Sequence, residues 1–298
     1  MPRRRRRRLA IFGLLALALC VWWCGRGPAL TLGTFNIRLF MDEYTDAGEV
    51  AAALAELDVD AVAVQEIRDL EAFARVVADA GASAGREYAA ALVPYCRKFE
   101  DRPIYLGVVY DAARLELVAR RRFGGDGTCT EGQPNGMLAL LRRRDGGQFA
   151  FASVHMKAGG QASDHARRRR EWAWLTAAIP GWTTELGAPV IVAGDFNSTG
   201  YLQADSEERR FIDRTLADRG LQLPTGALEC SEYWEQAPGH YAVSLLDHVL
   251  APEVLTFGAP EVLGVCAALA CEPQIFTPEG FLRVSDHCPV RIELVDGV

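Results

Sequence analysis

Acidic, amide and imidazole side chains follow apolar runs at several places in this sequence. Such side chains are costly to bury, so at the end of an apolar strand we expect them to face a site rather than the core. The residues that share this position are Asn36, Glu66, His155, Asp195, Asn197, Asp247, Asp286 and His287. We interpret them as candidates for one site assembled from segments scattered along the chain.

The chemistry of this set is that of a hydrated cation and a phosphoester. Most of its members offer oxygen atoms and none offers a thiolate, which favours Mg²⁺, with Mn²⁺ or Ca²⁺ as alternatives, over zinc. Mg²⁺ usually takes one or two carboxylates and completes its shell with water and phosphate oxygens. Histidine titrates near neutrality, so His287 and His155 are suited to moving protons during attack by water.

The spacing within two motifs adds detail. Asp195 and Asn197 are two residues apart, so an extended backbone points both side chains the same way and they can serve one centre. Gly194 allows a sharp turn just before them. Asp286 and His287 are adjacent and should diverge, which suits an acid on one side of a substrate and a proton-transfer group on the other.

The elements that must position these residues follow a mixed α/β pattern. Val, Ile, Leu and Phe predict strands at about residues 30–37, 60–66, 104–110, 115–121, 137–142, 148–155, 189–194, 243–250 and 290–294. Helical spacing of Ala, Leu, Glu and Arg predicts helices at about 46–57, 69–80, 164–178 and 206–219. Because some strands follow one another without an intervening helix, much of the sheet should be antiparallel.

Six short motifs, taken in order, resemble those of the endonuclease/exonuclease/phosphatase superfamily, whose members include DNase I-like nucleases, neutral sphingomyelinases and inositol-polyphosphate phosphatases. The motifs are ThrPheAsnIle at Asn36, ValGlnGlu at Glu66, SerValHisMetLys at His155, GlyAspPheAsn at Asp195, LeuAspHis at Asp247 and SerAspHisCysPro at His287. The resemblance implies a four-layer αββα sandwich of two largely antiparallel sheets flanked by helices. It also implies a site in a cleft between sheet edges.

For the cation and the phosphate, the resemblance implies specific holders. Glu66 would be the principal metal carboxylate, with Asn36 beside it and Asp286 in support. Asp195 and Asn197 would hold the attacking water and the phosphate.

For proton transfer, the resemblance implies two histidines. His287 would activate water, with Asp247 fixing its orientation. His155 would stabilise charge on the phosphate or protonate the leaving oxygen. Its acidic partner would be Glu100 or Asp101, between which spacing does not decide.

Other polar residues have structural interpretations. His248 should point away from Asp247 on a strand and is expected to be structural. At most one or two of Arg167 to Arg170 can face a cleft, because four successive residues encircle a helix; the rest are expected to be solvated. Cys288 is expected in a disulfide or as a buried thiol rather than as a nucleophile.

The N-terminus predicts export. Arg3 to Arg8 precede an apolar run from Leu9 to Trp23, which is shorter than the roughly 20 residues of a full membrane span. We therefore divide the chain into residues 1–28, an export signal or uncleaved membrane anchor, and residues 29–298, the endonuclease/exonuclease/phosphatase domain. The product would be periplasmic, secreted or anchored at its N-terminus.

Charge and cysteine content bound the partners and the compartment. Without the six leading arginines, 26 basic and 39 acidic residues remain, a net charge of −13, which counts against a non-specific polyanion binder. The six cysteines beyond the N-terminal run allow 15 disulfide connectivities and are Cys96, Cys129, Cys230, Cys266, Cys271 and Cys288.

The function predicted from these features is divalent-metal-dependent phosphodiester hydrolysis, with nucleic acid ahead of phospholipid as substrate. A membrane-proximal, sphingomyelinase-like lipid phosphodiesterase or a phosphatase is the alternative. A catalytically inactive, membrane-tethered binding module is a further one, although no catalytic position is lost. A zinc hydrolase using His155, His248 and His287 is less favoured because no HExxH pair exists. We expect a monomer without a protein partner.

Overall fold

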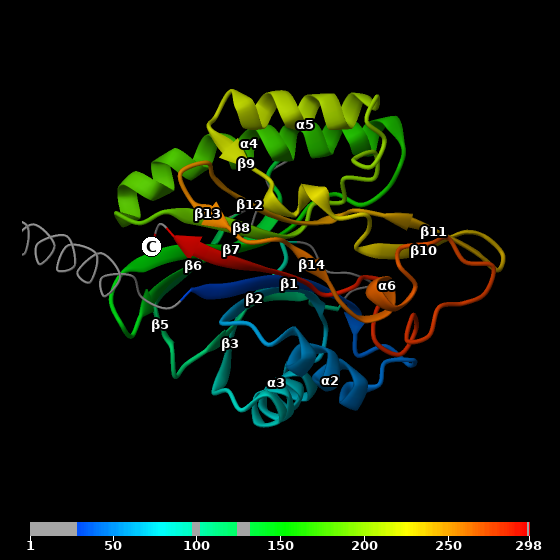
Figure 1. Cartoon of the computed structure of the whole chain (residues 1–298), viewed down its shortest axis with the longest axis horizontal. Coiled ribbons are helices and arrows are strands. Elements are labelled where there is room, and N and C mark those ends of the chain that lie inside the picture. Colours follow the sequence, from blue (N-terminus) through cyan, green and yellow to red (C-terminus); the bar gives the residue numbers. More distant parts are fainter. Residues whose placement is uncertain (1–28, 97–101, 124–131, 297) are drawn as a thin grey trace, which may run out of the picture.

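Two large β-sheets lie face to face at the centre of the molecule, with helices on both outer faces (Figure 1). The computed structural model describes residues 29–96, 102–123, 132–296 and 298. The predicted signal or anchor at residues 1–28 lies outside them. Within the described residues, none of the helices has the length and apolar character needed to cross a membrane.

The first sheet combines both ends of the described chain. Its order is β13-β15-β1-β2-β4-β3, with β14 also paired to β15. The bounds are β1 Leu30–Phe40, β2 Ala61–Ile67, β3 Tyr88–Pro94, β4 Tyr105–Asp111, β13 Thr256–Phe257, β14 Glu261–Val262 and β15 Val290–Asp296. Only β1 and β2 are parallel neighbours.

The second sheet takes the middle of the chain, in the order β5-β6-β7-β8-β12-β9. Its strands are β5 Leu115–Phe123, β6 Asn135–Arg143, β7 Gln148–His155, β8 Val190–Asp195, β9 Leu221–Gln222 and β12 Asp247–Pro252. Here β7 and β8 are the parallel pair. The expected predominance of antiparallel pairing is thus confirmed in both sheets.

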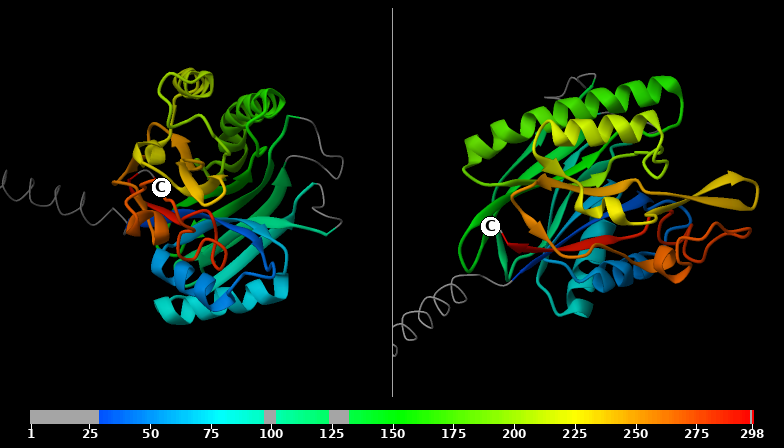
Figure 2. Two further views of the ribbon diagram at one scale, coloured as in Figure 1. Left: turned by 90° about the vertical axis from the view of Figure 1, so that its right-hand side faces the viewer. Right: turned by 45° about the horizontal axis from the view of Figure 1, so that its top comes forward.

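The helices begin at side-chain caps that the sequence supplies. The bounds are α2 Ala47–Leu57, α3 Leu70–Ala84, α4 Ala162–Leu186 and α5 Glu207–Ala217. Asp46 accepts hydrogen bonds from Gly48 N and Glu49 N at the start of α2, and Asp69 and Ser206 cap α3 and α5 in the same way. In both views of Figure 2, α2 and α3 lie on the opposite side of the sheets from α4 and α5. The predicted four-layer αββα sandwich is confirmed.

Three apolar clusters hold the layers together. One lies between the sheets and includes Leu32, Leu106, Phe149 and Phe151. A second joins α2 and α3 to the first sheet, and a third joins α4 and α5 to the second. No cysteine belongs to these three clusters. The fold therefore rests on strand alternation and helix amphipathicity.

A smaller, disulfide-bonded region stands beside the sandwich. It contains the β10–β11 hairpin (Glu232–Ala237 and His240–Ser244) and the short helix α6 (Gly264–Ala268). The 3-10 helix η1 (Pro224–Ala227) packs instead against β12 of the second sheet. The hairpin projects from the body (Figure 2). Neither this hairpin nor β3 was predicted, since their sequences are polar or alanine-rich.

Candidate active site

Strand pairing sets three of the predicted residues in a row. Asp195, at the end of β8, is directly opposite His155 on β7 and Asp247 on β12. Residues paired in register point to the same face of a sheet. One edge of the second sheet therefore presents an imidazole and two carboxylates together.

Asn36 of the first sheet is the meeting point of the set. Its Nδ2 lies 3.2 Å from Glu66 Oε1, 3.0 Å from Asp195 Oδ2 and 3.5 Å from His287 Nε2. These partners come from both sheets and from the segment before β15. Residues that are distant in sequence thus gather around one amide, as the spatial hypothesis required.

Glu66 adopts a backbone conformation that few residues other than glycine tolerate, with φ of 65°. The strand leaves its regular pairing here, as the register shift between β2 and β4 shows. Leu39 N donates to Glu66 Oε2 at 3.0 Å. The other oxygen, Oε1, accepts the hydrogen bond from Asn36 Nδ2, and Glu66 lines the cleft. Strain of this kind at a carboxylate is typical of a functional position.

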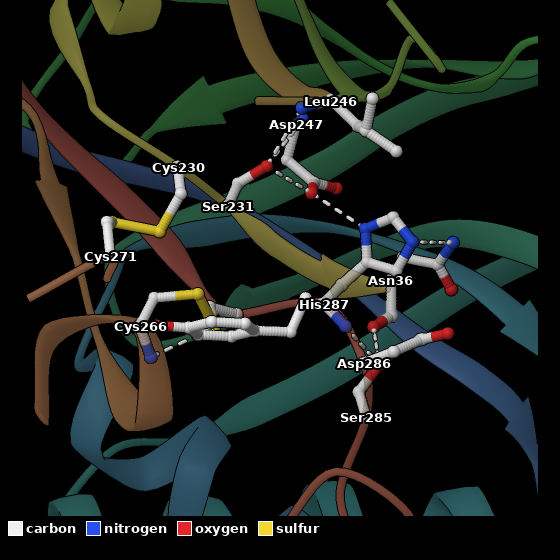
Figure 3. The surroundings of a disulfide bond; sticks show 12 residues. Asn36, Cys230, Ser231, Leu246, Asp247, Cys266, Cys271, Ser285, Asp286 and His287 are labelled. Carbon is white, nitrogen blue, oxygen red and sulfur yellow. Dashed lines mark hydrogen bonds and ion pairs between the residues drawn. A yellow bond between two sulfur atoms is a disulfide. The ribbon is translucent and has the colours of Figure 1, made fainter. Parts of the chain in front are cut away.

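His287 and Asp247 form a buried hydrogen-bonded pair (Figure 3). His287 Nδ1 lies 2.8 Å from Asp247 Oδ2, and Ser231 Oγ donates to the same oxygen at 2.7 Å. The geometry makes Nδ1–H the donor, which leaves Nε2 facing Asn36, Asp195 Oδ2 at 3.8 Å and Glu232 Oε1 at 3.9 Å. A neutral His287 thus presents a free base to the cleft.

Among the described residues, Tyr95 is the hydrogen-bond partner of His155 Nδ1. His155 Nδ1 lies 2.7 Å from the hydroxyl of Tyr95, and that hydroxyl also accepts a hydrogen bond from Glu66 N at 3.1 Å. Burial raises the pKa of Tyr95 well above its usual value, so the hydroxyl keeps its proton and can donate it to Nδ1. His155 Nε2 then points toward Asp195 Oδ2 at 3.4 Å. Glu100 and Asp101 lie outside the described residues.

Asn197 is oriented by its neighbours. Its N–H donates to Asp195 Oδ1 at 2.8 Å, and its Nδ2 donates to the carbonyl of Met156 at 3.2 Å. The residue is 6% exposed and has φ of 50°. It fixes the carboxylate of Asp195, and its own contact with a phosphate stays a prediction.

A cleft of about 530 Å³ opens over these residues. Its walls include Glu66, His155, Asp286 and His287 together with the cationic side chains of Arg38, Lys157 and Arg167. Each of these cations already has a carboxylate partner: Asp42 at 2.8 Å, Asp164 at 3.0 Å and Glu171 at 2.9 Å, respectively. The cleft is therefore not a strongly positive surface.

Burial and crowding shift the titration of the acids. Burial, with nearby negative charge, raises the pKa of Asp286 and of Asp247, and it raises that of Glu232 to about 8. Burial alone would lower the pKa of His287, but Asp247 and Asp195 raise it well above its usual value. The site thus concentrates negative charge that its own cations do not offset.

This arrangement fits a divalent cation. Asp195, Asp247 and His287 each offer an atom within 4.8 Å of the others, and Glu66 and Asp286 line the same cleft. Carboxylate oxygens in excess, with room for water and phosphate, match the preference of Mg²⁺ or Mn²⁺. These contacts define a possible metal-binding group without selecting the ion. Within it, Asp247 Oδ2 is already bonded to His287 Nδ1 and Ser231 Oγ, so we expect a cation to bind the carboxylates that line the cleft rather than this pair.

Three residues of the site were not predicted: Tyr95, Ser231 and Glu232. Glu232 forms a backbone bridge with His287, and its side chain is 14% exposed. The surrounding sequence, CysSerGluTyrTrp, matches none of the six family motifs. Only the pairing of the β10 start with the segment before β15 brings Ser231 and Glu232 to the histidine.

The structural interpretations of neighbouring residues were right with one exception. His248 is fully buried, bonds Ser198 Oγ at 2.8 Å, and has its pKa lowered to about 3 by burial. Arg167 reaches the cleft. Arg168 was expected in solvent but is fully buried, because Glu208 and backbone carbonyls of the 157–159 segment bind its guanidinium. Cys288 is disulfide-bonded, as expected.

The fold and the site together define a class of protein, the metal-site phosphoester hydrolases built on an αββα sandwich. Residues 33–287 match the Endonuclease/Exonuclease/phosphatase family. The chain belongs to this family and is a phosphoester hydrolase. No match was found among curated proteins.

Solved structures support the fold. An endonuclease/exonuclease/phosphatase family protein from Bacteroides thetaiotaomicron is 17% identical with a TM-score of 0.64, covering 91% of this chain and 99% of its own. The mannosyl-6-phosphatase Bt3783 from Bacteroides thetaiotaomicron VPI-5482 is 18% identical with a TM-score of 0.63, covering 90% and 100%. TDP2 from D. rerio, complexed with single strand DNA product, is 14% identical with a TM-score of 0.61, covering 90% and 99%.

Proposed function

We propose that this protein hydrolyses phosphodiester bonds with a bound divalent cation, Mg²⁺ or Mn²⁺, and a histidine-activated water. The observation that carries the proposal is the convergence of Glu66, Asp195 and His287 on the amide of Asn36. Glu66, Asn36 and Asp286 would hold the cation. When bound, the cation would polarise the phosphoryl oxygens and offset the charge of the carboxylates.

The side chains of the chain divide the proton transfers between them. His287 Nε2 takes the proton of the attacking water, and Asp247 holds Nδ1–H and stabilises the imidazolium that forms. Asp195 and Asn197 orient water and phosphate at the centre of the cleft. His155, held by Tyr95 at 2.7 Å, directs Nε2–H toward the oxygen on which charge develops. The reaction needs no covalent intermediate.

Nucleic acid is the first substrate that we propose, as in TDP2, whose structure contains single strand DNA product. One observation favours a second candidate, a small or lipid phosphoester. Arg38, Lys157 and Arg167 are all ion-paired within the cleft wall, and the body carries a net charge of −13. A long polyanion would gain little from such a surface.

Residues 1–28 carry a further proposal, that the enzyme is exported and cleaved or anchored there, so that it acts outside the cytosol. The proposal is supported by the arginine run and the apolar run after it. If the N-terminal apolar run is not cleaved, it would hold the enzyme at a membrane, close to a lipid substrate.

The central test compares Glu66→Ala and His287→Ala with the wild type on bis-(p-nitrophenyl) phosphate with Mg²⁺ or Mn²⁺. We expect turnover to fall by about 10²–10⁴-fold in each variant, because general-base catalysis contributes about that much. EDTA should abolish wild-type turnover. His240→Ala, at an exposed histidine of β11, is the matched control. EDTA-sensitive turnover at the wild-type rate in His287→Ala would refute the assigned base.

A substrate panel then separates the candidates. It contains single-stranded DNA, RNA, sphingomyelin vesicles and p-nitrophenyl phosphate. A nuclease cleaves the first two with strong salt dependence. Preference for vesicles or for the monoester, with little salt dependence, supports the second candidate.

A further inference from the structure

Two disulfide bonds lie beside the segment that carries the catalytic histidine (Figure 3). Cys288 follows His287 in the chain and is bonded to Cys266, and Cys230 precedes Ser231 and is bonded to Cys271. The backbone joins the two, because Cys288 N donates to the carbonyl of Ser231 at 2.8 Å. Each disulfide therefore adjoins one of the residues that bind Asp247 Oδ2.

Ser231 controls the orientation of Asp247. Its Oγ donates to Asp247 Oδ2 at 2.7 Å and accepts from Leu246 N and Asp247 N, both at 3.0 Å. Asp247 Oδ2 is also the acceptor for His287 Nδ1. A shift of Ser231 would therefore rotate the carboxylate that fixes the imidazole.

Regular secondary structure gives this region little support. Among the described residues, those between β14 and β15 contain only the five-residue helix α6 and turns. The strand β10 pairs with β11 and meets the rest of the chain through the Glu232–His287 bridge and neighbouring backbone bonds. The buried cysteines, with Tyr233 and Tyr241, form the apolar cluster of this region. Disulfide bonds therefore provide stabilisation that a larger hydrophobic core would provide elsewhere.

We infer that the two disulfides are positioning elements of the catalytic pair. Cys266–Cys288 sets the backbone of His287, and Cys230–Cys271 sets Ser231 and through it Asp247. The three apolar clusters of the sandwich contain no cysteine, so Asn36 and Glu66, which lie on sandwich strands, keep their places without the cross-links. Because a displacement of about 1 Å can cost about 10²-fold in rate, only the oxidised protein turns over at full speed. This inference rests on the proposed function.

Reduction of each of these disulfide bonds is a two-electron step. A dithiol such as dithiothreitol gives two electrons and two protons to the protein disulfide. Two cysteine thiols form, and the reductant closes to its own cyclic disulfide. Reoxidation reverses the step.

The test uses two double variants, Cys266→Ser with Cys288→Ser and Cys230→Ser with Cys271→Ser, in the full chain. We expect kcat on bis-(p-nitrophenyl) phosphate to fall about 10–100-fold in both double variants. In Cys230→Ser with Cys271→Ser, KM and the Kd for Mn²⁺ should stay within about twofold of wild type, because this disulfide adjoins Ser231. Cys266→Ser with Cys288→Ser should also weaken the binding of Mn²⁺, because Asp286 lies two residues from Cys288. Val76→Ala, in the core under α3, is the control for lost stability and should keep wild-type kcat. Ser231→Ala should reproduce the loss and Ser231→Thr should restore activity.

A second readout does not depend on turnover. Side-chain NMR of histidine nitrogens detects the Nδ1–H of His287 as a downfield proton while it is bonded to Asp247. We expect this signal in the wild type and in Val76→Ala, and its loss in both double variants. A folded double variant that keeps the signal and kcat overturns the inference. A Kd for Mn²⁺ that weakens in parallel with kcat in Cys230→Ser with Cys271→Ser also overturns it. An inactive wild type that shows the signal refutes the proposed function alone.

Discussion

The two oxygens of the Asp247 carboxylate have unequal roles. Oδ2 binds Ser231 and His287, whereas Oδ1 is buried without a hydrogen-bond partner among the described residues. Burying a carboxylate oxygen without a hydrogen bond costs free energy of folding. Such a residue is expected where its charge and orientation serve the function. Here they fix the tautomer of His287.

Replacing this carboxylate by an amide should remove the charge that stabilises the imidazolium. For Asp247→Asn we expect kcat to fall by about 10⁴-fold or somewhat less, as for the comparable acid in serine proteases. The Kd for Mn²⁺ should stay near the wild-type value. Steady-state kinetics and calorimetry measure the two, with Asp213→Asn on the solvent side of α5 as control. An unchanged kcat would show that Asp247 has no part in proton transfer.

Glu232 makes the metal-free protein sensitive to pH. Burial raises its pKa from the usual 4.5 to about 8. Between these values the native state holds a proton that the unfolded chain has lost, so rising pH lowers stability. Glu232→Gln removes this penalty.

In EDTA, the melting temperature of Glu232→Gln relative to wild type should therefore rise between pH 5 and pH 8.5, by about 2–4 °C for each 1 kcal/mol. Differential scanning fluorimetry measures it. Glu235→Gln, exposed on the same strand, should show no such trend. A constant difference across this range would contradict the raised pKa.

The polar residues at strand ends were predictable because an acid, amide or histidine is costly to bury, so after an apolar run it is expected to face a site. Asn36, Glu66, His155 and Asp195 follow this rule, whereas Asp247 begins β12 and His287 precedes β15. Ser231 and Tyr95 do not follow it, since their roles depend on hydrogen bonds formed only after the chain folds, to Asp247 and to His155. Arg168 was misjudged because its buried partner, Glu208, lies 40 residues away.

Two β-α-β units carry four of the eight predicted site residues. β1, α2 and β2 place Asn36 and Glu66 at the ends of parallel neighbours, and β7, α4 and β8 do the same for His155 and Asp195. The ends of parallel strands meet at one sheet edge. The strands and helices of these units were predictable from apolar periodicity, whereas the polar β10–β11 hairpin has no such signal.

Gly194 allows β7 and β8 to pair closely before Asp195. Its φ is 153°, and a Cβ there would overlap the backbone oxygen of Val154. Gly194→Ala should therefore displace Asp195, lowering stability by about 1–3 kcal/mol and kcat by about 10²-fold.

Urea unfolding and kinetics measure both effects. Gly160→Ala is the matched control, since a Cβ there meets no atom within 4 Å. Wild-type kinetics in Gly194→Ala would show that the strand pair tolerates a wider spacing.

At the scale of the whole protein, the proposed cation binding should compete with proton binding. The pKa values of Asp286 and His287 are raised in the metal-free state, so a bound cation must displace protons. Affinity for Mn²⁺ should therefore increase with pH, and binding should release protons.

Calorimetry in buffers of different ionisation enthalpy measures this release directly. At a concentration of about 100 times Kd the cation should also stabilise the fold by about 2.7 kcal/mol. Glu66→Ala should lose most of that stabilisation, whereas Glu71→Ala, exposed on α3, should keep it. A Kd for Mn²⁺ that does not vary with pH would contradict the competition.

Each β-α-β unit belongs to a different sheet, so neither sheet alone contains a working centre. During refolding, backbone structure can form in either half before the halves associate. Turnover should therefore return later than helical and strand content, at the moment when Asn36 reaches Asp195. Catalytic turnover is therefore a measure of correct association of the two sheets. A chain that has formed both sheets without joining them has nearly all of its secondary structure and no catalysis.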